Sequence, residues 1–443
     1  MRIDRLTLRN FKGFDSREFQ FHPEFNLIVG RNGTGKTSIL DALSVATGSW
    51  FLGVRDVLAR HIRANEVLLK RHEYKNTTEN EQDDSSIILW ESCFPCEITA
   101  HGRVQERDIT WSRSLNSSRG RTTHGNASKI KELAFRSDQA IRNGEEIRLP
   151  LISYYGTGRL WPESREAYTV SDPTKVASKE ELSRLAGYWG STDPRISASQ
   201  LTRWIAQQSW ITFQQYNRVP PIFLAIRHAL ISCIENATSI EFDAKLGEVV
   251  VEIDGVFQPF TNLSDGQRSM LAMVGDIAQK AAKLNPHLGG RVLRETLGVV
   301  LIDELDLHLH PRWQRRVIDD LRRTFPKIQF ICTTHSPFLI QSLRSGEELI
   351  MLDGQPTADL WNMSLEEIAT GIQRVPDLRA SQRYAEMKGV AKAYLERLEE
   401  GPKAPEQELA DFKQRLAESI APYADNPAFQ AFLEMKRVVK LGE

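Results

Sequence analysis

Cysteine is scarce in this chain, with four residues among 443. So few cysteines exclude a disulfide-stapled scaffold and favour a reducing compartment. Cys93 and Cys96 form a lone C-x-x-C pair, without a second pair or histidines at metal-ligand spacing. We interpret them as strand residues on either side of Pro95, and a zinc site is the alternative.

Long apolar runs are absent as well, and the net charge is close to zero. No apolar stretch reaches the roughly 18 residues of a membrane-spanning helix, and the opening residues lack the apolar core of a signal peptide. We therefore expect a cytoplasmic protein with no membrane partner. The 57 basic and 58 acidic side chains give a net charge of −1, so no overall field draws the protein to nucleic acid.

A glycine-rich segment stands between an apolar run at 25–29 and a helical pattern at 38–46. The segment reads Gly-Arg-Asn-Gly-Thr-Gly-Lys-Thr and fits the P-loop pattern in its required strand–loop–helix context. Glycines let backbone N–H groups converge on phosphate oxygens, Lys36 reaches the β- and γ-phosphates, and the Thr37 hydroxyl suits Mg²⁺. We therefore expect ATP and Mg²⁺ as cofactors. The expected nucleotide contacts are Gly30, Asn32, Gly33, Gly35, Lys36, Thr37 and Ser38.

A second apolar run, at 297–302, ends in two carboxylates. We expect a buried strand that delivers Asp303 to the Mg²⁺ shell and Glu304 to the water that attacks the γ-phosphate. A solvated acidic turn after a buried strand is the alternative for this segment alone. Its occurrence in one chain with a P-loop favours the catalytic interpretation.

Two shorter segments complete the set. Leu-Ser-Asp-Gly-Gln at 263–267 precedes a helical pattern that runs to about 283, and alone it predicts a helix cap at Ser264 or Asp265. Cys-Thr-Thr-His-Ser-Pro at 332–337 directly follows an apolar strand pattern at 328–332. Alone, His335 is a loop residue at a strand end.

The order of these four motifs resembles that of ABC-type ATPases of the RecF, OLD and SMC branch. The 263–267 segment resembles their signature, with Asp265 in place of a glycine. The resemblance implies that Ser264, Gly266 and Gln267 clamp a nucleotide held by the partner's P-loop, and that His335 contacts the γ-phosphate. Lys36, Glu304 and His335 are then the catalytic residues, and Thr37 and Asp303 the metal ligands.

Several further residues stay open between two interpretations. His308 and His310 are either metal ligands or a family trait, with Pro311 opening a helix. Arg159, in Tyr-Tyr-Gly-Thr-Gly-Arg at 154–159, is either an active-site or interface residue or a surface arginine. Asn10 to Lys12 either border the adenine or do not. The glutamine that ABC-type ATPases carry in their Q-loop has no clear counterpart.

The spacing sets the domain plan. Roughly 270 residues separate Lys36 from Asp303, and no sustained heptad pattern lies between them, so a long coiled coil is excluded. The expected α/β fold is an ABC-type P-loop head with a mixed central sheet, flanking helices and an antiparallel β arm. We assign the head to 1–60 and 237–350, the β arm to 61–160, a helical insert to 161–236, and a helical partner-binding region to 351–443, with helices at 384–400 and 405–420.

The short tail after His335 carries no convincing Toprim-like acidic motif, which separates the chain from OLD nucleases. Its layout is most similar to Septu-type and retron-associated antiphage ATPases of the PtuA kind. That resemblance implies a homodimer or higher oligomer that regulates a separate HNH-type nuclease, with a retron reverse transcriptase and its msDNA as further partners. The alternative is a RecF-like repair ATPase that binds DNA directly. A transporter ATPase is disfavoured by Asp265 and by the His-Leu-His-Pro segment.

Overall fold

The computed structural model describes residues 1–75, 86–160, 183–194, 198–215, 218–352, 364–373, 389–396, and the single residues 433, 435, 436 and 438. The chain divides into a unit from Met1 to Ile368 and a unit from Ala369 to Glu443. In the second unit, 389–396 are helical and Tyr394 is buried. The expected helix at 405–420 lies outside the described residues, as do residues 161–182, 195–197 and 216–217 of the expected helical insert at 161–236.

A five-stranded parallel sheet forms the centre of the first unit. All residues of its four longer strands are buried, as expected for a parallel sheet covered on both faces. Because the strands are parallel, their carboxyl ends meet at one edge, where α/β folds bind ligands. The strand order is β14 (Leu349–Met351), β3 (Phe25–Val29), β13 (Ile328–Thr333), β12 (Gly298–Ile302) and β8 (Leu151–Tyr155).

Helix α1 (Lys36–Thr47) lies between this sheet and a second, antiparallel one. It contacts β12 and β13 on one side and β6 and β7 on the other, so nearly all of its residues are buried. A helix that is buried all round needs apolar or small residues on every face, and the 38–46 segment supplies them except at Asp41, which is paired with Lys12 and Arg60. The antiparallel sheet has the order β2 (Phe14–Gln20), β1 (Arg2–Phe11), β6 (Cys96–Val104), β7 (Arg107–Leu115).

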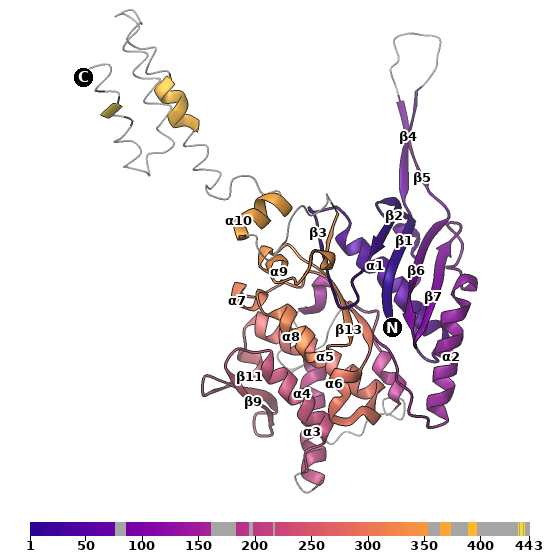
Figure 1. The fold of residues 1–443 in the computed structure, drawn as a ribbon, viewed down its shortest axis with the longest axis vertical. Helices are drawn as coiled ribbons and strands as arrows, with labels where there is room; N and C mark the ends of the chain where they lie inside the picture. Colours follow the sequence, from indigo (N-terminus) through magenta and orange to yellow (C-terminus); the bar gives the residue numbers. More distant parts are fainter. Residues whose placement is uncertain are drawn as a thin grey trace, which may run out of the picture. The chain divides into compact units, whose positions relative to one another are not determined.

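Two smaller β elements accompany these sheets. The hairpin of β4 (Leu69–Lys75) and β5 (Ser86–Ser92) projects from the antiparallel sheet, and α2 (Ser128–Arg142) packs against β7 (Figure 1). The three-stranded meander is β9 (Ala237–Asp243), β10 (Glu248–Ile253) and β11 (Val256–Pro259).

The described helices other than α1 and α2 are α3 (Ala198–Gln214), α4 (Pro221–Ser232), α5 (Asp265–Leu284), α6 (Val292–Glu295), α7 (Pro311–Gln314), α8 (Val317–Thr324), α9 (Pro337–Gln341) and α10 (Leu365–Glu367). Of these helices, α5 contacts β8 of the central sheet, and α3 and α4 contact α5 and the β9–β11 meander. Among the described helices, none has the length and apolar content needed to cross a bilayer.

The α/β class with antiparallel strands is confirmed, and the structure refines its details. The antiparallel strands form sheets of their own, and every pairing in the central sheet is parallel. The range 61–160 holds antiparallel strands as expected, but it also contains α2 and the parallel strand β8. Strand β8 pairs with β12 in the central sheet, where all five of its residues, Leu151–Tyr155, are buried.

Candidate functional site

The P-loop connects β3 to α1 at the carboxyl edge of the sheet. Gly33 and Gly35 have φ angles of +83° and +97°, which favour glycine because a Cβ atom is strained there. A Cβ on Gly35 would also lie 2.7 Å from the ring of Phe14. The loop thus needs its glycines both for its backbone turn and for close packing against β2.

Lys36 begins α1 and turns its side chain into the loop. Its ammonium donates to the Gly30 carbonyl at 2.8 Å and to the Arg31 carbonyl at 3.0 Å, and the residue is only 8% exposed. The positive charge is therefore held inside the curve of the loop, next to the N-terminus of a 12-residue helix. Both features attract anionic groups such as phosphates.

Asp303 lies directly after β12 and is held by two hydroxyl groups. The Thr37 hydroxyl donates to one carboxylate oxygen at 2.9 Å, and the Thr333 hydroxyl donates to the other at 2.6 Å. Thr37 and Asp303 thus lie in direct contact although they are distant in sequence. Hydroxyl and carboxylate oxygens are hard ligands of the kind that Mg²⁺ prefers, so this pair fits a magnesium site.

Glu304 follows with an unusual backbone. Its φ angle is +49°, in the left-handed region that costs a residue with a Cβ atom roughly 1 kcal/mol or more. Its N–H donates to the Thr333 hydroxyl at 2.8 Å, and its carbonyl accepts from Arg159 at 2.7 Å. The half-buried side chain is therefore carried by a backbone that is fixed on both sides.

Arg159 is only 2% exposed, which excludes the surface-arginine interpretation. Its guanidinium also donates to the carbonyl of Asp303 at 2.6 Å and to that of Gly156 at 3.2 Å. Burial lowers the pKa of Arg159, and the negative charges of Asp303, Asp306 and Glu304 oppose that shift. The residue follows β8, the strand beside β12, so sheet pairing brings it to the acidic residues.

His335 follows β13 and is exposed, although the hydroxyl residues on either side of it, Thr334 and Ser336, are buried. The Thr334 hydroxyl donates to Asp306 at 2.5 Å, and the Ser336 hydroxyl donates to Gln314 at 2.6 Å. These bonds tie the segment around His335 to Asp306, in the loop that follows Glu304, and to α7 (Pro311–Gln314). The histidine is therefore at the same sheet edge as the P-loop and Asp303.

The 263–267 segment forms the N-terminus of α5 with a capping box. Gln267 N–H donates to the Ser264 hydroxyl at 3.3 Å, and the Gln267 side chain accepts from the Ser264 N–H at 2.9 Å. Ser264 and Asp265 are exposed, whereas Gly266 is buried. A Cβ on Gly266 would lie 2.6 Å from the His308 carbonyl oxygen, so this turn packs against the loop after Glu304.

Of the histidine pair, His310 has a structural contact. His310 accepts through Nδ1 from the Arg312 N–H at 3.3 Å and caps α7. Within the described ranges, no group of three or more histidine, cysteine, aspartate or glutamate residues is arranged to hold a metal ion. Cys96 is buried in β6, and burial raises the pKa of its thiol to about 12, which disfavours a thiolate ligand.

The 10–12 segment touches α1 rather than the P-loop in the described contacts. Lys12 forms an ion pair with Asp41 of α1 and lies 3.8 Å from Glu66. Arg60 joins the same two carboxylates at 2.9 and 2.7 Å. Asn10 donates to the Pro95 carbonyl at 3.0 Å. The ion pairs of Lys12 and Arg60 with Asp41 anchor α1. A role for the 10–12 segment at the adenine remains a prediction.

Sequence reasoning gave no role to Thr333 or Phe14. Thr333 stands within the quoted Cys-Thr-Thr-His segment, directly after the last residue of the expected strand, where a buried hydroxyl is a signal for a polar contact. Phe14 follows Gly13 in a strand whose alternation is broken by polar residues. Its contact with Gly35 depends on the packing of two sheets, for which the sequence holds no local signal.

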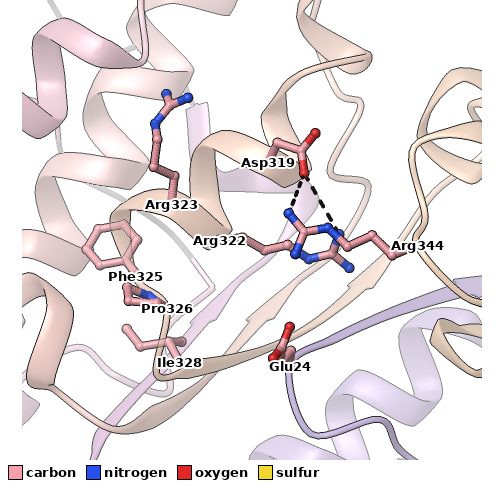
Figure 2. Close-up of a pocket in the computed structure, with 8 residues that line it drawn as sticks. All are labelled: Glu24, Asp319, Arg322, Arg323, Phe325, Pro326, Ile328 and Arg344. Carbon is pink, nitrogen blue, oxygen red and sulfur yellow. Dashed lines mark hydrogen bonds and ion pairs between the residues drawn. The ribbon is translucent and has the colours of Figure 1, made fainter.

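A cavity of about 240 Å³ lies at the opposite edge of the sheet, where β13 begins. Asp319 lies 3.9 Å from the guanidinium group of Arg322 and 3.1 Å from that of Arg344, and dashed lines mark both contacts in Figure 2. Arg322 is also paired with Glu348. No P-loop, acidic-strand or signature residue lines this cavity, so the motif residues gather at a different edge.

Comparison with known proteins identifies relatives that resemble this chain along most of its length. The "Retron Vc95 probable ATPase" of Vibrio cholerae serotype O1 biovar El Tor is 25% identical over 404 residues, which cover 78% of this chain and 73% of that protein. The "Septu protein PtuA" of Bacillus mycoides strain KBAB4 is 25% identical over 361 residues, which cover 80% of this chain and 41% of that protein. These relatives confirm the resemblance inferred from the motifs.

Among solved structures, an SMC head bound to the C-terminal winged-helix domain of ScpA aligns with 79% of this chain and 94% of its own, at a TM-score of 0.43 and 17% identity.

The family model described as "AAA domain, putative AbiEii toxin, Type IV TA system" matches residues 25–341. This match spans well over half of the chain and includes all four motifs. The protein therefore belongs to this AAA-domain family and is an ATPase.

Proposed function

We propose that Lys36, Thr37, Asp303 and Glu304 form the catalytic centre for hydrolysis of ATP with Mg²⁺. The contact between the Thr37 hydroxyl and the Asp303 carboxylate carries this proposal, because it joins the P-loop to the acidic strand. Thr37 and Asp303 would hold Mg²⁺, which neutralises charge on the phosphates when bound. Glu304 orients the attacking water, and Lys36 and His335 stabilise negative charge on the transferred phosphoryl group.

Loss-of-function variants test this centre. Lys36→Ala removes the ammonium and weakens ATP binding, whereas Glu304→Gln keeps binding and stops turnover because the amide is a poor base. Binding of a fluorescent ATP analogue and release of phosphate are the two measurements. Unchanged turnover in both purified variants would refute the assignment.

The active unit is a dimer in which each P-loop faces the Ser264 turn of the partner. The exposed Ser264 and Asp265 at the N-terminus of a 20-residue helix support this arrangement, because helix N-termini attract phosphate. Glu304→Gln, which retains ATP, should then sediment as a dimer or larger oligomer only when ATP is present. A Glu304→Gln protein that stays monomeric at saturating ATP would exclude the arrangement.

The ATPase regulates a separate effector nuclease in bacterial antiphage defence. The names of the retron and Septu relatives support this role. The partner expected is an HNH-type nuclease, with a retron reverse transcriptase and its msDNA in retron-type systems. Co-purification with the product of the adjacent gene, followed by nuclease assays with ATP and with a non-hydrolysable analogue, tests the idea. A neighbouring protein that forms no complex, or whose nuclease activity ignores ATP, would refute it.

A further inference from the structure

Arg159 contacts the acidic strand end through its main chain. Its Nη1 donates to the Asp303 carbonyl at 2.6 Å, and its Nη2 donates to the Glu304 carbonyl at 2.7 Å. We propose that Arg159 is a positioning residue for ATP hydrolysis, which holds these two peptide groups so that the Glu304 carboxylate faces the attacking water. The inference rests on the proposed catalytic role of Glu304.

The backbone at Glu304 needs such support. A left-handed φ of +49° persists at a residue with a Cβ atom only where neighbouring groups enforce it. Thr333 holds the N–H of Glu304, and Arg159 holds its carbonyl. The Glu304 carbonyl also accepts from the Leu307 N–H at 2.9 Å, and the Leu305 N–H of the same peptide group donates to the Thr333 carbonyl at 2.9 Å. Loss of Arg159 removes the one charged donor among these three hydrogen bonds, so the peptide group relaxes toward an ordinary φ. The carboxylate then leaves its position relative to the bound nucleotide.

Arg159 is itself fixed by the loop after β8. Asp303 N–H donates to the Tyr155 carbonyl at 2.7 Å, and Gly156 N–H donates to the Pro194 carbonyl at 2.8 Å. A Cβ on Gly156 would lie 2.6 Å from the Pro194 side chain, so the two segments are in close contact. The guanidinium therefore couples the position of the 156–160 loop to the backbone of Glu304.

An arginine suits this position better than a lysine. The planar guanidinium presents several donors in a fixed fork, so that it can serve two carbonyls at once, whereas an ammonium group on a flexible stem cannot hold the same pair in one plane. The buried charge also lies near Asp303, Asp306 and Glu304. Arg159→Lys thus keeps the charge and loses the fork, and Arg159→Met loses both.

Arg184 offers a matched control. It also donates from its guanidinium to main-chain carbonyls, those of Leu284 at 2.8 and 3.0 Å and of Ile147 at 2.6 Å. Leu284 ends α5, at the opposite end of that helix from Ser264. Arg184→Met therefore removes a comparable set of hydrogen bonds away from the proposed catalytic centre.

The experiment measures kcat, the Kd of a fluorescent ATP analogue and the melting temperature for the full-length variants. We expect kcat to fall about 100-fold in Arg159→Met and about tenfold in Arg159→Lys, with Kd changed less than about threefold, because displacement of a catalytic group affects the chemical step. Arg184→Met should lower the melting temperature about as much as Arg159→Met does, but its kcat should stay within about twofold of wild type.

If the wild-type protein hydrolyses ATP normally, three results would overturn this inference and leave the proposed function intact. One is a kcat near wild type in both Arg159 variants. Another is a loss of kcat in Arg184→Met as large as that in Arg159→Met. The third is failure of both Arg159 variants to fold or to bind ATP, which marks a purely structural role. Absence of turnover in the wild-type protein would instead overturn the proposed function first.

Discussion

Replacement of Thr333 by valine tests how the fold holds its acidic residues. The buried Thr333 hydroxyl donates to Asp303 at 2.6 Å and accepts from the Glu304 N–H at 2.8 Å. Valine has nearly the same shape, so the variant leaves no cavity. It removes one hydrogen bond to a charged group and leaves the Glu304 N–H without its partner.

The size of the effect follows from these two losses. A hydrogen bond to a charged group contributes about 1.5–3 kcal/mol, and an unpaired polar group that is cut off from water costs about 1–3 kcal/mol. We expect Thr333→Val to lower the free energy of unfolding by about 3–5 kcal/mol, a large part of the roughly 5–15 kcal/mol typical of a folded domain. Thr333→Ser keeps the hydroxyl and should lose only about 1 kcal/mol for its methyl group.

Urea unfolding of the purified variants measures this difference, and phosphate release measures its effect on turnover. Thr324→Val is the matched control. The Thr324 hydroxyl donates at 2.7 Å to the main-chain carbonyl of Asp320 within α8, away from Asp303 and Glu304. It should cost about 1 kcal/mol or less and leave kcat unchanged. A Thr333→Val protein within about 1 kcal/mol of wild type, with normal kcat, would refute the reasoning.

Two further predictions concern glycines and thiols. Gly35→Ala should lower both stability and ATP affinity by more than Gly33→Ala, because both have positive φ but only a Cβ on Gly35 meets the Phe14 ring; equal thermal unfolding and equal Kd in the two variants would contradict this. Burial raises the pKa of Cys96 and Cys233 to about 12, so the folded state retains protons that the unfolded state releases above pH 9. The free energy of unfolding should therefore fall as pH rises from 9 toward 12, and urea titrations should show a shallower fall in the Cys96→Ala/Cys233→Ala variant.

Three of the four nucleotide motifs could be placed from the sequence because each follows an apolar strand pattern. Parallel strands that end at one edge bring Lys36, Asp303 and His335 together, so the order of the motifs predicts the site. The contact between Thr37 and Asp303 follows from the same rule. The helix at α5 was also predicted, because its capping residues and its amphipathic pattern agree locally.

The remaining features depend on tertiary packing. The sequence leaves Arg159 open between an active-site or interface residue and a surface arginine, and the pairing of β8 with β12 brings it beside Asp303. Strand β4 is rich in polar and charged residues and carries no alternating apolar pattern, so its pairing with β5 was not expected. The polar helix α2 has no counterpart among the expected elements, because its range falls within the 61–160 region assigned to the β arm; its buried face contacts β7.

A substitution at Ser264 separates the capping role from the phosphate-binding role. Aspartate caps a helix as well as serine does, so Ser264→Asp should melt near the wild-type temperature. The added negative charge faces the γ-phosphate in the proposed dimer and should abolish turnover. Ser264→Asp therefore provides a folded, inactive subunit for mixing experiments.

The shared site is tested most directly by mixing Lys36→Ala subunits with Ser264→Asp subunits. Each variant alone should be inactive. A mixed dimer, however, has one site with an intact P-loop from one subunit and an intact Ser264 turn from the other. Random pairing of equal amounts should restore about a quarter of wild-type turnover, because half of the dimers are mixed and each has one working site of two. A mixture that stays inactive, although mass analysis shows mixed dimers, would contradict a nucleotide site shared between two copies.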